Sequence, residues 1–183
     1  MSTCRIEGSA RTAPTPATAT PTTSGSLAGC VPVHRNVRAV VEAGRRLGVE
    51  VHPKEFPAGT RTAAGVDLGQ IVKSLVFSVD GEVVVALVSG DNLCDEEKLA
   101  RAAGGRRAWR EDADTVREAT GFPIGGVPPF GHREPLRVFI DEDLLAFDEL
   151  WAAAGTPHVN FPIEPAELVR ATGGTVCDLA RRR

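Results

Sequence analysis

The sequence lacks most of the features that assign a function at first sight. Its four cysteines form no Cys-x-x-Cys pair and no zinc-type spacing, which leaves independent, reduced thiols as the simplest account. Its four histidines lack metal-ligand spacing, and no Walker A, dinucleotide-binding or Gly-x-Ser-x-Gly motif occurs. We therefore expect no metal and no cofactor. The sequence also disfavours NTP hydrolysis, hydride transfer and metal-dependent hydrolysis.

Long apolar runs and an excess of charge are also missing. No run approaches the length of a transmembrane helix, and the N-terminus lacks the charged-then-apolar order of a signal peptide. We expect a cytoplasmic protein with no membrane partner. The net charge of −3 gives no global footprint of a nucleic-acid binder, so an RNA partner would need a local basic patch. The candidates for such a patch are Arg101, Arg106, Arg107, Arg110 and the terminal run 181–183.

The first 30 residues are rich in Ala, Thr, Pro, Ser and Gly and show no apolar periodicity. Such a composition cannot bury enough apolar surface to offset the entropy lost on ordering, so we expect residues 1–30 to be a disordered tail. Residues 31–183 are enough for one ordinary domain, and a hydrophobic content of 42% supplies a sizeable core. The sequence therefore predicts one domain preceded by a tail.

Apolar periodicity and turn residues divide residues 31–183 into short helices and strands. Asp80-Gly81 between two β-rich runs is a strong hairpin signal, and the apolar run 83–88 is typical of a central strand. Hairpins mixed with single helices indicate an α/β (mixed α+β) fold and not a doubly wound parallel sheet. The predicted helices cover residues 34–47, 62–68, 95–102, a short turn capped by Thr115, 142–147 and 165–171. The predicted strands cover residues 49–56, 71–79, 82–89, 136–140, 150–154, 159–163 and 175–177.

The segment 121–132 holds four glycines and three prolines in a dozen positions. Glycine permits positive φ and close approach of a ligand, while proline fixes φ and removes an N–H. The segment is therefore predicted to be a loop of specified shape, and such loops on a rigid scaffold often bind ligands. A purely structural loop, whose prolines limit the entropy of the unfolded chain, is the alternative.

Only three of the 21 basic residues are lysines, and Lys73 lies inside the predicted strand 71–79. Alternation along the strand places it with Leu75 and Phe77 on the more apolar face, where a charge needs a partner. A cation at the edge of an apolar pocket suits an anionic group or a developing oxyanion. The alternative is a stem that covers apolar surface while the amine reaches water. Ser74 projects to the opposite face, so a Ser–Lys dyad is not expected.

Several segments together resemble one known family. They are residues 70–77 (Gln-Ile-Val-Lys-Ser-Leu-Val-Phe), the Gly90-Asp91 turn, residues 121–129 (Gly-Phe-Pro-Ile-Gly-Gly-Val-Pro-Pro), and the segments 151–157 and 167–169. In this order they resemble the YbaK/ProX family, free-standing relatives of the editing (insertion) domain of bacterial prolyl-tRNA synthetase. The resemblance implies one domain with a mixed, largely antiparallel, curved sheet flanked by helices. It also implies hydrolysis of mischarged aminoacyl-tRNA.

The resemblance also implies site residues. Lys73 matches the lysine strand of the family, and its Gly-x-x-x-Pro loop matches Gly125–Pro129 or a frame shifted by one. We expect Lys73, Gly125 and Gly126 to be catalytic. Lys73 would bind the terminal-adenosine phosphate or the ester carbonyl region, and N–H groups of Gly125, Gly126 and Val127 would stabilise the oxyanion. No side chain stands out as a general base, in agreement with family members in which substrate groups assist. The expected substrate-binding residues are Ser74, Val127, Pro128, Pro129, His132 and His158.

The implied function is a trans-editing deacylase acting on mischarged aminoacyl-tRNA, with a synthetase or an elongation factor as a candidate protein partner. Alanine, cysteine, serine and threonine all stay open as the amino acid removed. The loop departs from the Gly-Gly-Cys-Ser-Pro type of cysteine-removing relatives, which weakens a Cys-tRNA assignment. One alternative is a non-catalytic module that binds a small ligand, a nucleotide or a tRNA end in the same cleft. Another is a hydrolase of small-molecule esters or amides.

Overall fold

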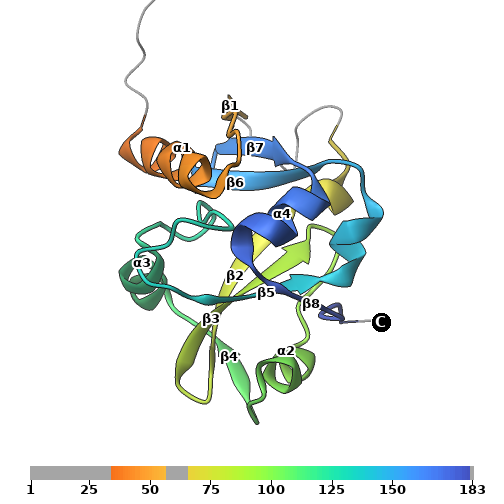
Figure 1. Ribbon diagram of the computed structural model, residues 1–183. Coiled ribbons are helices and arrows are strands. Elements are labelled where there is room, and N and C mark those ends of the chain that lie inside the picture. The colour runs from red at the N-terminus through yellow and green to blue at the C-terminus, as the bar shows by residue number, and fades with distance from the viewer. Residues whose placement is uncertain (1–33, 57–65, 182–183) are drawn as a thin grey trace, which may run out of the picture. The chain divides into compact units, whose positions relative to one another are not determined.

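The computed structural model describes residues 34–56 and 66–181, which belong to the compact unit Pro32–Arg183 (Figure 1). The predicted tail, residues 1–30, lies outside the described residues and stays a prediction. The helices are α1 Arg35–Leu47, α2 Glu96–Ala103, α3 Ala113–Thr120 and α4 Pro165–Thr172, with 3-10 helices η2 Leu68–Gln70 and η3 Glu142–Ala146. The strands are β1 Lys54–Glu55, β2 Val72–Val79, β3 Glu82–Ser89, β4 Ala108–Arg110, β5 Arg137–Asp141, β6 Leu150–Thr156, β7 Val159–Ile163 and β8 Thr175–Cys177.

Capping residues explain where the helices begin and end. His34 accepts a hydrogen bond from the N–H of Asn36 at the start of α1, and Gly48 ends that helix with φ 70°. The carboxylate of Asp95 accepts hydrogen bonds from two N–H groups in the first turn of α2. The helices predicted over 34–47, 95–102 and 165–171 are therefore confirmed to within one residue at each end.

Other local predictions differ from the structure. Asp112, and not Thr115, caps α3, because its carboxylate accepts from the N–H groups of Asp114 and Thr115; Gly121 ends the helix as expected. The strand predicted over 49–56 is reduced to β1, and the helix predicted over 142–147 is the 3-10 helix η3. Most of the helix predicted over 62–68 lies outside the described residues. Strand β4 was not predicted at all.

The strands form two sheets. A five-stranded sheet has the order β4-β2-β3-β5-β8, and a three-stranded sheet has the order β1-β7-β6. The pairs β2–β3, β2–β4, β6–β7 and β1–β7 are antiparallel, while β3–β5 and β5–β8 are parallel. The mixed, largely antiparallel α/β fold is thereby confirmed, and β3 is central as predicted. A bridge between Ile71 and Trp151 links the sheets.

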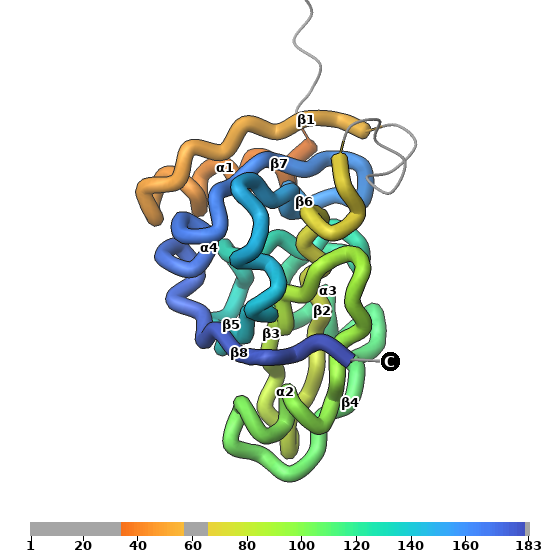
Figure 2. Tube along the Cα trace, turned by 90° about the vertical axis from the view of Figure 1, so that its right-hand side faces the viewer, coloured from red at the N-terminus to blue at the C-terminus, as the bar shows by residue number. Residues whose placement is uncertain are grey.

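Each face of the five-stranded sheet packs on a different apolar cluster. The larger cluster joins one face to α1, α4, the loop after α3 and the strands β6 and β7. The smaller cluster joins the other face to α2 and to Leu179, which lies in the segment that follows β8. Figure 2 shows this segment crossing the five-stranded sheet near α2. No helix within the described ranges is long and apolar enough to cross a membrane.

Candidate active site

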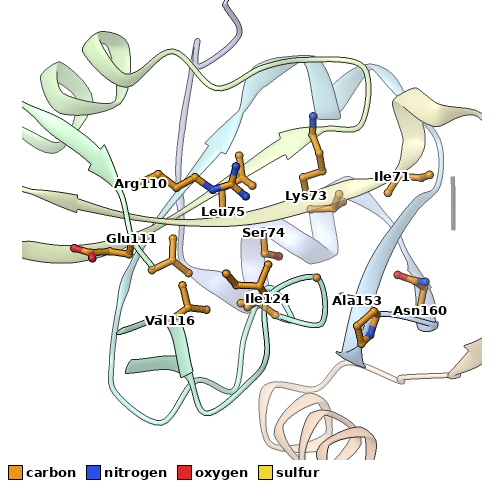
Figure 3. A pocket seen from close by; sticks show the side chains of 15 residues that line it. Ile71, Lys73, Ser74, Leu75, Arg110, Glu111, Val116, Ile124, Ala153 and Asn160 are labelled. Atoms are coloured by element: carbon orange, nitrogen blue, oxygen red, sulfur yellow. The ribbon is translucent and has the colours of Figure 1, made fainter. Parts of the chain in front are cut away.

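A pocket of about 380 Å³ lies along one edge of β2, opposite the edge that pairs with β3 (Figure 3). One wall comes from the end of β4 and from α3, and the other comes from the glycine-proline loop and the three-stranded sheet. The pocket therefore joins segments that are up to 89 residues apart in the chain, from Ile71 to Asn160. The lining residues are Ile71, Val72, Lys73, Ser74, Leu75, Val76, Arg110, Glu111, Val116, Ile124, Gly125, Val127, Ala153, Pro157 and Asn160.

The register of the hairpin explains why this edge is open. Asp80 and Gly81 adopt positive φ, so a two-residue turn makes Val79 and Glu82 a hydrogen-bonded pair. Alternate residues back along β2 then exchange hydrogen bonds with β3, and the intervening residues direct their N–H and C=O groups to the other edge. Strand β4 covers that edge only at residues 77–79, and the N–H of Glu111 donates to the carbonyl of Val76 (3.1 Å). The main-chain groups of Ser74 therefore face the pocket.

The side chain of Ser74 also points into the pocket, toward Ile124 in Figure 3. Its Oγ is buried and has no hydrogen-bond partner among the described residues. A buried hydroxyl without a partner costs about 1–3 kcal/mol, which a ligand can recover by supplying a partner. Ser74 thus lines the pocket, and its role in substrate binding stays a prediction.

Lys73 leaves β2 in the opposite direction (Figure 3). Its Nζ donates to the carbonyls of Gly90 (3.1 Å) and Asn92 in the turn after β3, while the residue also lines the pocket. Leu75 and Phe77, on the same face of β2, pack in the smaller cluster, as alternation predicted. Lys73 is therefore a lining residue whose ammonium is held by this turn, on the face of β2 away from the side chain of Ser74. Because Ser74 lies on the other face, the two side chains form no dyad.

The glycine-proline loop approaches the pocket through a tight turn at Pro123–Gly126. Gly125 has φ 82°, and the N–H of Gly126 donates to the carbonyl of Pro123 (2.9 Å). Gly126 also lies against β6, where a Cβ would come within 2.7–2.9 Å of three backbone atoms of Thr156. Of the three amides expected to face an oxyanion, that of Gly126 is thus engaged in the turn. Gly125 and Val127 line the pocket.

The rest of the loop serves mainly to hold its shape. Pro128 and Pro129 are buried and do not line the pocket. The Nε2 of His132 lies 2.8 Å from the carbonyl oxygen of Pro128, so a hydrogen bond from the imidazole stabilises the conformation of the loop. His158 is exposed and does not line the pocket, although its carbonyl accepts from the N–H of Phe56 (2.7 Å). Neither histidine lines the pocket, and their role in substrate binding stays a prediction.

Acidification is expected to lower the stability of the fold through His132, because its largely buried imidazole is costly to charge. Burial lowers the pKa of His132 below its ordinary value of 6.5, although the hydrogen bond to Pro128 opposes this shift. The unfolded chain then binds the proton more readily, so the free energy of unfolding falls as the pH drops from 6.5 through the folded-state pKa. Chemical denaturation at about pH 7.5 and about pH 5 should show this loss in the wild type and less of it in His132→Gln. Equal losses in both proteins would contradict the interpretation.

Sequence reasoning missed part of the pocket wall. Arg110 and Glu111 enter it because β4 pairs with β2, and a three-residue strand carries too little periodicity to be recognised. The arginine cluster that includes Arg110 was the available signal. Asn160 is buried in β7 and reaches the pocket only through the pairing of β6 and β7. Throughout residues 34–56 and 66–181, no three His, Cys, Asp or Glu side chains are grouped to hold a metal ion.

Comparison with known proteins gives one family. The model of the aminoacyl-tRNA editing domain matches residues 58–171, which include every residue that lines the pocket. A solved structure described as a candidate trans-editing enzyme for prolyl-tRNA synthetase is 43% identical in sequence, with a TM-score of 0.77. The match covers 82% of this chain and 99% of that one.

Curated relatives include larger enzymes. The proline–tRNA ligase of Maridesulfovibrio salexigens is 38% identical over 98 residues, which are 52% of this chain but only 17% of the ligase. A candidate Cys-tRNA(Pro)/Cys-tRNA(Cys) deacylase of Enterococcus faecalis, EbsC, is 24% identical over 120 residues, or 64% of this chain and 73% of that protein. The chain therefore spans less than a fifth of the ligase and most of the free-standing relative.

Proposed function

The chain belongs to the aminoacyl-tRNA editing domain family, and from this we propose that it is a trans-editing hydrolase that deacylates mischarged aminoacyl-tRNA. In the reaction, water adds to the carbonyl carbon of the aminoacyl ester, and the bond to the ribose oxygen then breaks. The products are a free amino acid and a tRNA with its terminal hydroxyl restored. An ester is already activated, so the protein mainly has to position the water and stabilise the oxyanion.

The pocket at the open edge of β2 carries this proposal. It is the place where Lys73 and Ser74 meet Gly125 and Val127 of the loop, although the two segments are about 50 residues apart. The N–H groups of Gly125 and Val127 are the proposed oxyanion donors, and Gly126 sets their positions through its turn. The hydroxyl of Ser74, together with its main-chain groups, is proposed to bind the aminoacyl group.

Lys73 is proposed to supply the positive charge. Its ammonium is held by the carbonyls of Gly90 and Asn92, and its potential is proposed to favour a phosphate of the terminal adenosine or the developing ester oxyanion. The carboxylate of Glu111 points away from Ser74 and from the loop in Figure 3. We therefore propose that the substrate itself, through a ribose hydroxyl, assists the attack of water.

Substrate identity and partners belong to the same proposal. The pocket lining includes the small apolar side chains of Val76, Val116, Val127 and Ala153, which suit a small amino-acid side chain. An extra methylene in such a pocket discriminates by only about 1–3 kcal/mol, so selectivity among small side chains is expected to be graded. We propose a cytoplasmic protein that meets its tRNA alone or on a synthetase.

The proposal is tested by incubating the protein with pre-charged Ala-, Cys-, Ser-, Thr- and Pro-tRNA and following the release of the amino acid. We expect selective hydrolysis of one mischarged species, with Lys73→Ala as the matched inactive variant. Binding of charged tRNA without hydrolysis of any species would instead support a non-catalytic module. Equal activity on minimal aminoacyl esters and on charged tRNA would support a hydrolase of small esters.

A further inference from the structure

The position of the Lys73 ammonium depends on the turn Gly90–Asn92. Its Nζ donates to two main-chain carbonyls of this turn, those of Gly90 and Asn92, so a movement of the turn disturbs contacts that hold the charge. The turn follows directly after β3, and the N–H of Asn92 closes it onto the carbonyl of Ser89 (3.0 Å). Gly90 lies so close to η2 that a Cβ would come within 2.1 Å of the carbonyl oxygen of Leu68. One side of the turn is therefore fixed by packing.

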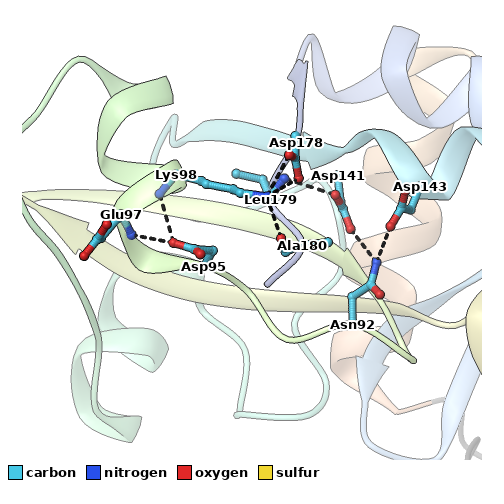
Figure 4. A network of polar contacts seen from close by, with 9 residues as sticks. All are labelled: Asn92, Asp95, Glu97, Lys98, Asp141, Asp143, Asp178, Leu179 and Ala180. Carbon is cyan, nitrogen blue, oxygen red and sulfur yellow. Dashed lines mark hydrogen bonds and ion pairs between the residues drawn. The ribbon is translucent and has the colours of Figure 1, made fainter. Parts of the chain in front are cut away.

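The other side is fixed by the side chain of Asn92 (Figure 4). Its Nδ2 donates to Asp141 Oδ2 (3.0 Å) and to Asp143 Oδ2 (2.7 Å), so both amide hydrogens are used. Hydrogen bonds to charged acceptors are stronger than those between neutral groups. A neutral amide thus separates two carboxylates and ties the turn to the end of β5 and the start of η3.

Asp141 is anchored in turn by the segment after β8. Asp141 is fully buried, and its Oδ1 accepts from the N–H of Leu179 (3.1 Å). The same segment also pairs with the residues that follow Asn92. The N–H of Asp95 donates to the carbonyl of Leu179, and the N–H of Arg181 donates to the carbonyl of Leu93 (both 2.8 Å). A buried carboxylate needs such partners, and Asn92 is one of the two donors to Asp141 that the structure records.

We propose that Asn92 is a positioning residue, which holds the Gly90–Asn92 turn against Asp141 and Asp143 and so fixes the ammonium of Lys73. The inference rests on the function proposed for Lys73. An amide suits this place because it donates twice without adding charge. A carboxylate at position 92 would face two others, and the repulsion would drive the turn away from η3.

The first test measures the ammonium of Lys73 directly and needs no tRNA. The chain has three lysines, so acylation by a water-soluble ester reagent can be followed at each one by mass spectrometry. In Asn92→Asp we expect Lys73 to react at least about threefold faster than in the wild type. Lys54, which lies over the ring of Trp151, is the reference, and Lys98, bound to Asp178, reports on the segment after β8.

The second test asks whether the position matters for deacylation. We expect Asn92→Asp and Asn92→Ala to lower kcat by about tenfold while KM changes less, because misplaced groups lose their orientation. In a Lys73→Met background the same substitutions should have little further effect. Thr172→Val, which removes the hydrogen bonds of a half-buried hydroxyl to the carbonyl of Leu168 and from the N–H of Gly174, is the control for stability. Adding Asp143→Asn to Asn92→Asp restores a donor–acceptor pair and should recover part of the activity.

The outcomes separate this inference from the proposed function. Unchanged labelling of Lys73, or a parallel rise at Lys98, overturns the inference whether or not the protein is a deacylase. Equal losses of kcat with and without Lys73 also overturn it. If the wild type hydrolyses no charged tRNA, the proposed function fails, and the labelling of Lys73 alone decides whether Asn92 holds the ammonium. Asn92→Ala, which adds no repulsion, serves if Asn92→Asp does not fold.

Discussion

Replacing Lys73 by methionine is expected to lower kcat/KM for deacylation by about 10²–10³-fold, the loss typical of removing one preorganised electrostatic contact. Methionine keeps most of the apolar stem of Lys73 but removes the charge held by the carbonyls of Gly90 and Asn92. Arginine is not an equivalent replacement, because its planar fork cannot meet the two carbonyls as a compact ammonium does. Lys73→Arg should therefore recover only part of the activity.

Lys54→Met is the matched control for this experiment. It removes the same charge from a lysine that lies 4.9 Å from the ring centroid of Trp151 and does not line the pocket. Steady-state kinetics on one charged tRNA, with thermal unfolding of all three proteins, separates loss of the site from loss of stability. A Lys73→Met protein that is folded and as active as Lys54→Met would remove Lys73 from the mechanism.

Replacing Gly126 by alanine should have the second large effect. The added Cβ would lie 2.7–2.9 Å from backbone atoms of Thr156, and backbone cannot rotate away as the end of a side chain can. Overpacking of this kind costs about 3 kcal/mol, and here it would push the loop away from β6. We expect a lower free energy of unfolding in urea and a loss of deacylation larger than the loss of stability explains.

Gly125→Ala is the informative comparison, because its cost has a different origin. Gly125 has φ 82°, and a Cβ there would meet nothing closer than 3.7 Å. The strain of positive φ costs about 1–2 kcal/mol for alanine, and asparagine tolerates that conformation better. Gly125→Asn should therefore be milder than Gly125→Ala. If the free energy of unfolding of Gly126→Ala equals that of Gly125→Asn, the close contact of Gly126 with β6 does not limit the loop.

Local signals predicted the elements that specify their own geometry. Asp80-Gly81 fixed the hairpin and, through its register, the faces of Lys73 and Ser74. The glycines and prolines of segment 121–132 likewise predicted a loop, and the structure has neither helix nor strand there. Thr115 was misassigned as a cap because its spacing to Glu118 is that of a capping box, whereas Asp112 reaches the first N–H groups of α3.

Features that depend on distant partners could not be predicted in this way. Residues 108–110 form strand β4 because they pair with the edge of β2 that β3 leaves open, and this pairing brings Arg110 to the pocket. Asn160 comes to the site through the pairing of β7 with β6. Nothing local shows that the N–H of Gly126 closes a turn, or that His158 stays outside the pocket.

The parallel pairing of β8 with β5, and the segment that follows it, also bear on protein synthesis. Every residue that lines the pocket has been translated once the ribosome reaches Asn160. Asp141, however, gains its hydrogen bond from the N–H of Leu179 only after that residue has been made. The main-chain hydrogen bonds of Leu93 and Asp95 likewise require residues 179–181. Because a growing chain emerges from its N-terminal end, the pocket residues are made before residues 179–181, whose main-chain hydrogen bonds stabilise the segments behind the pocket. A nascent chain therefore carries an unfinished site until residues 179–181 have emerged.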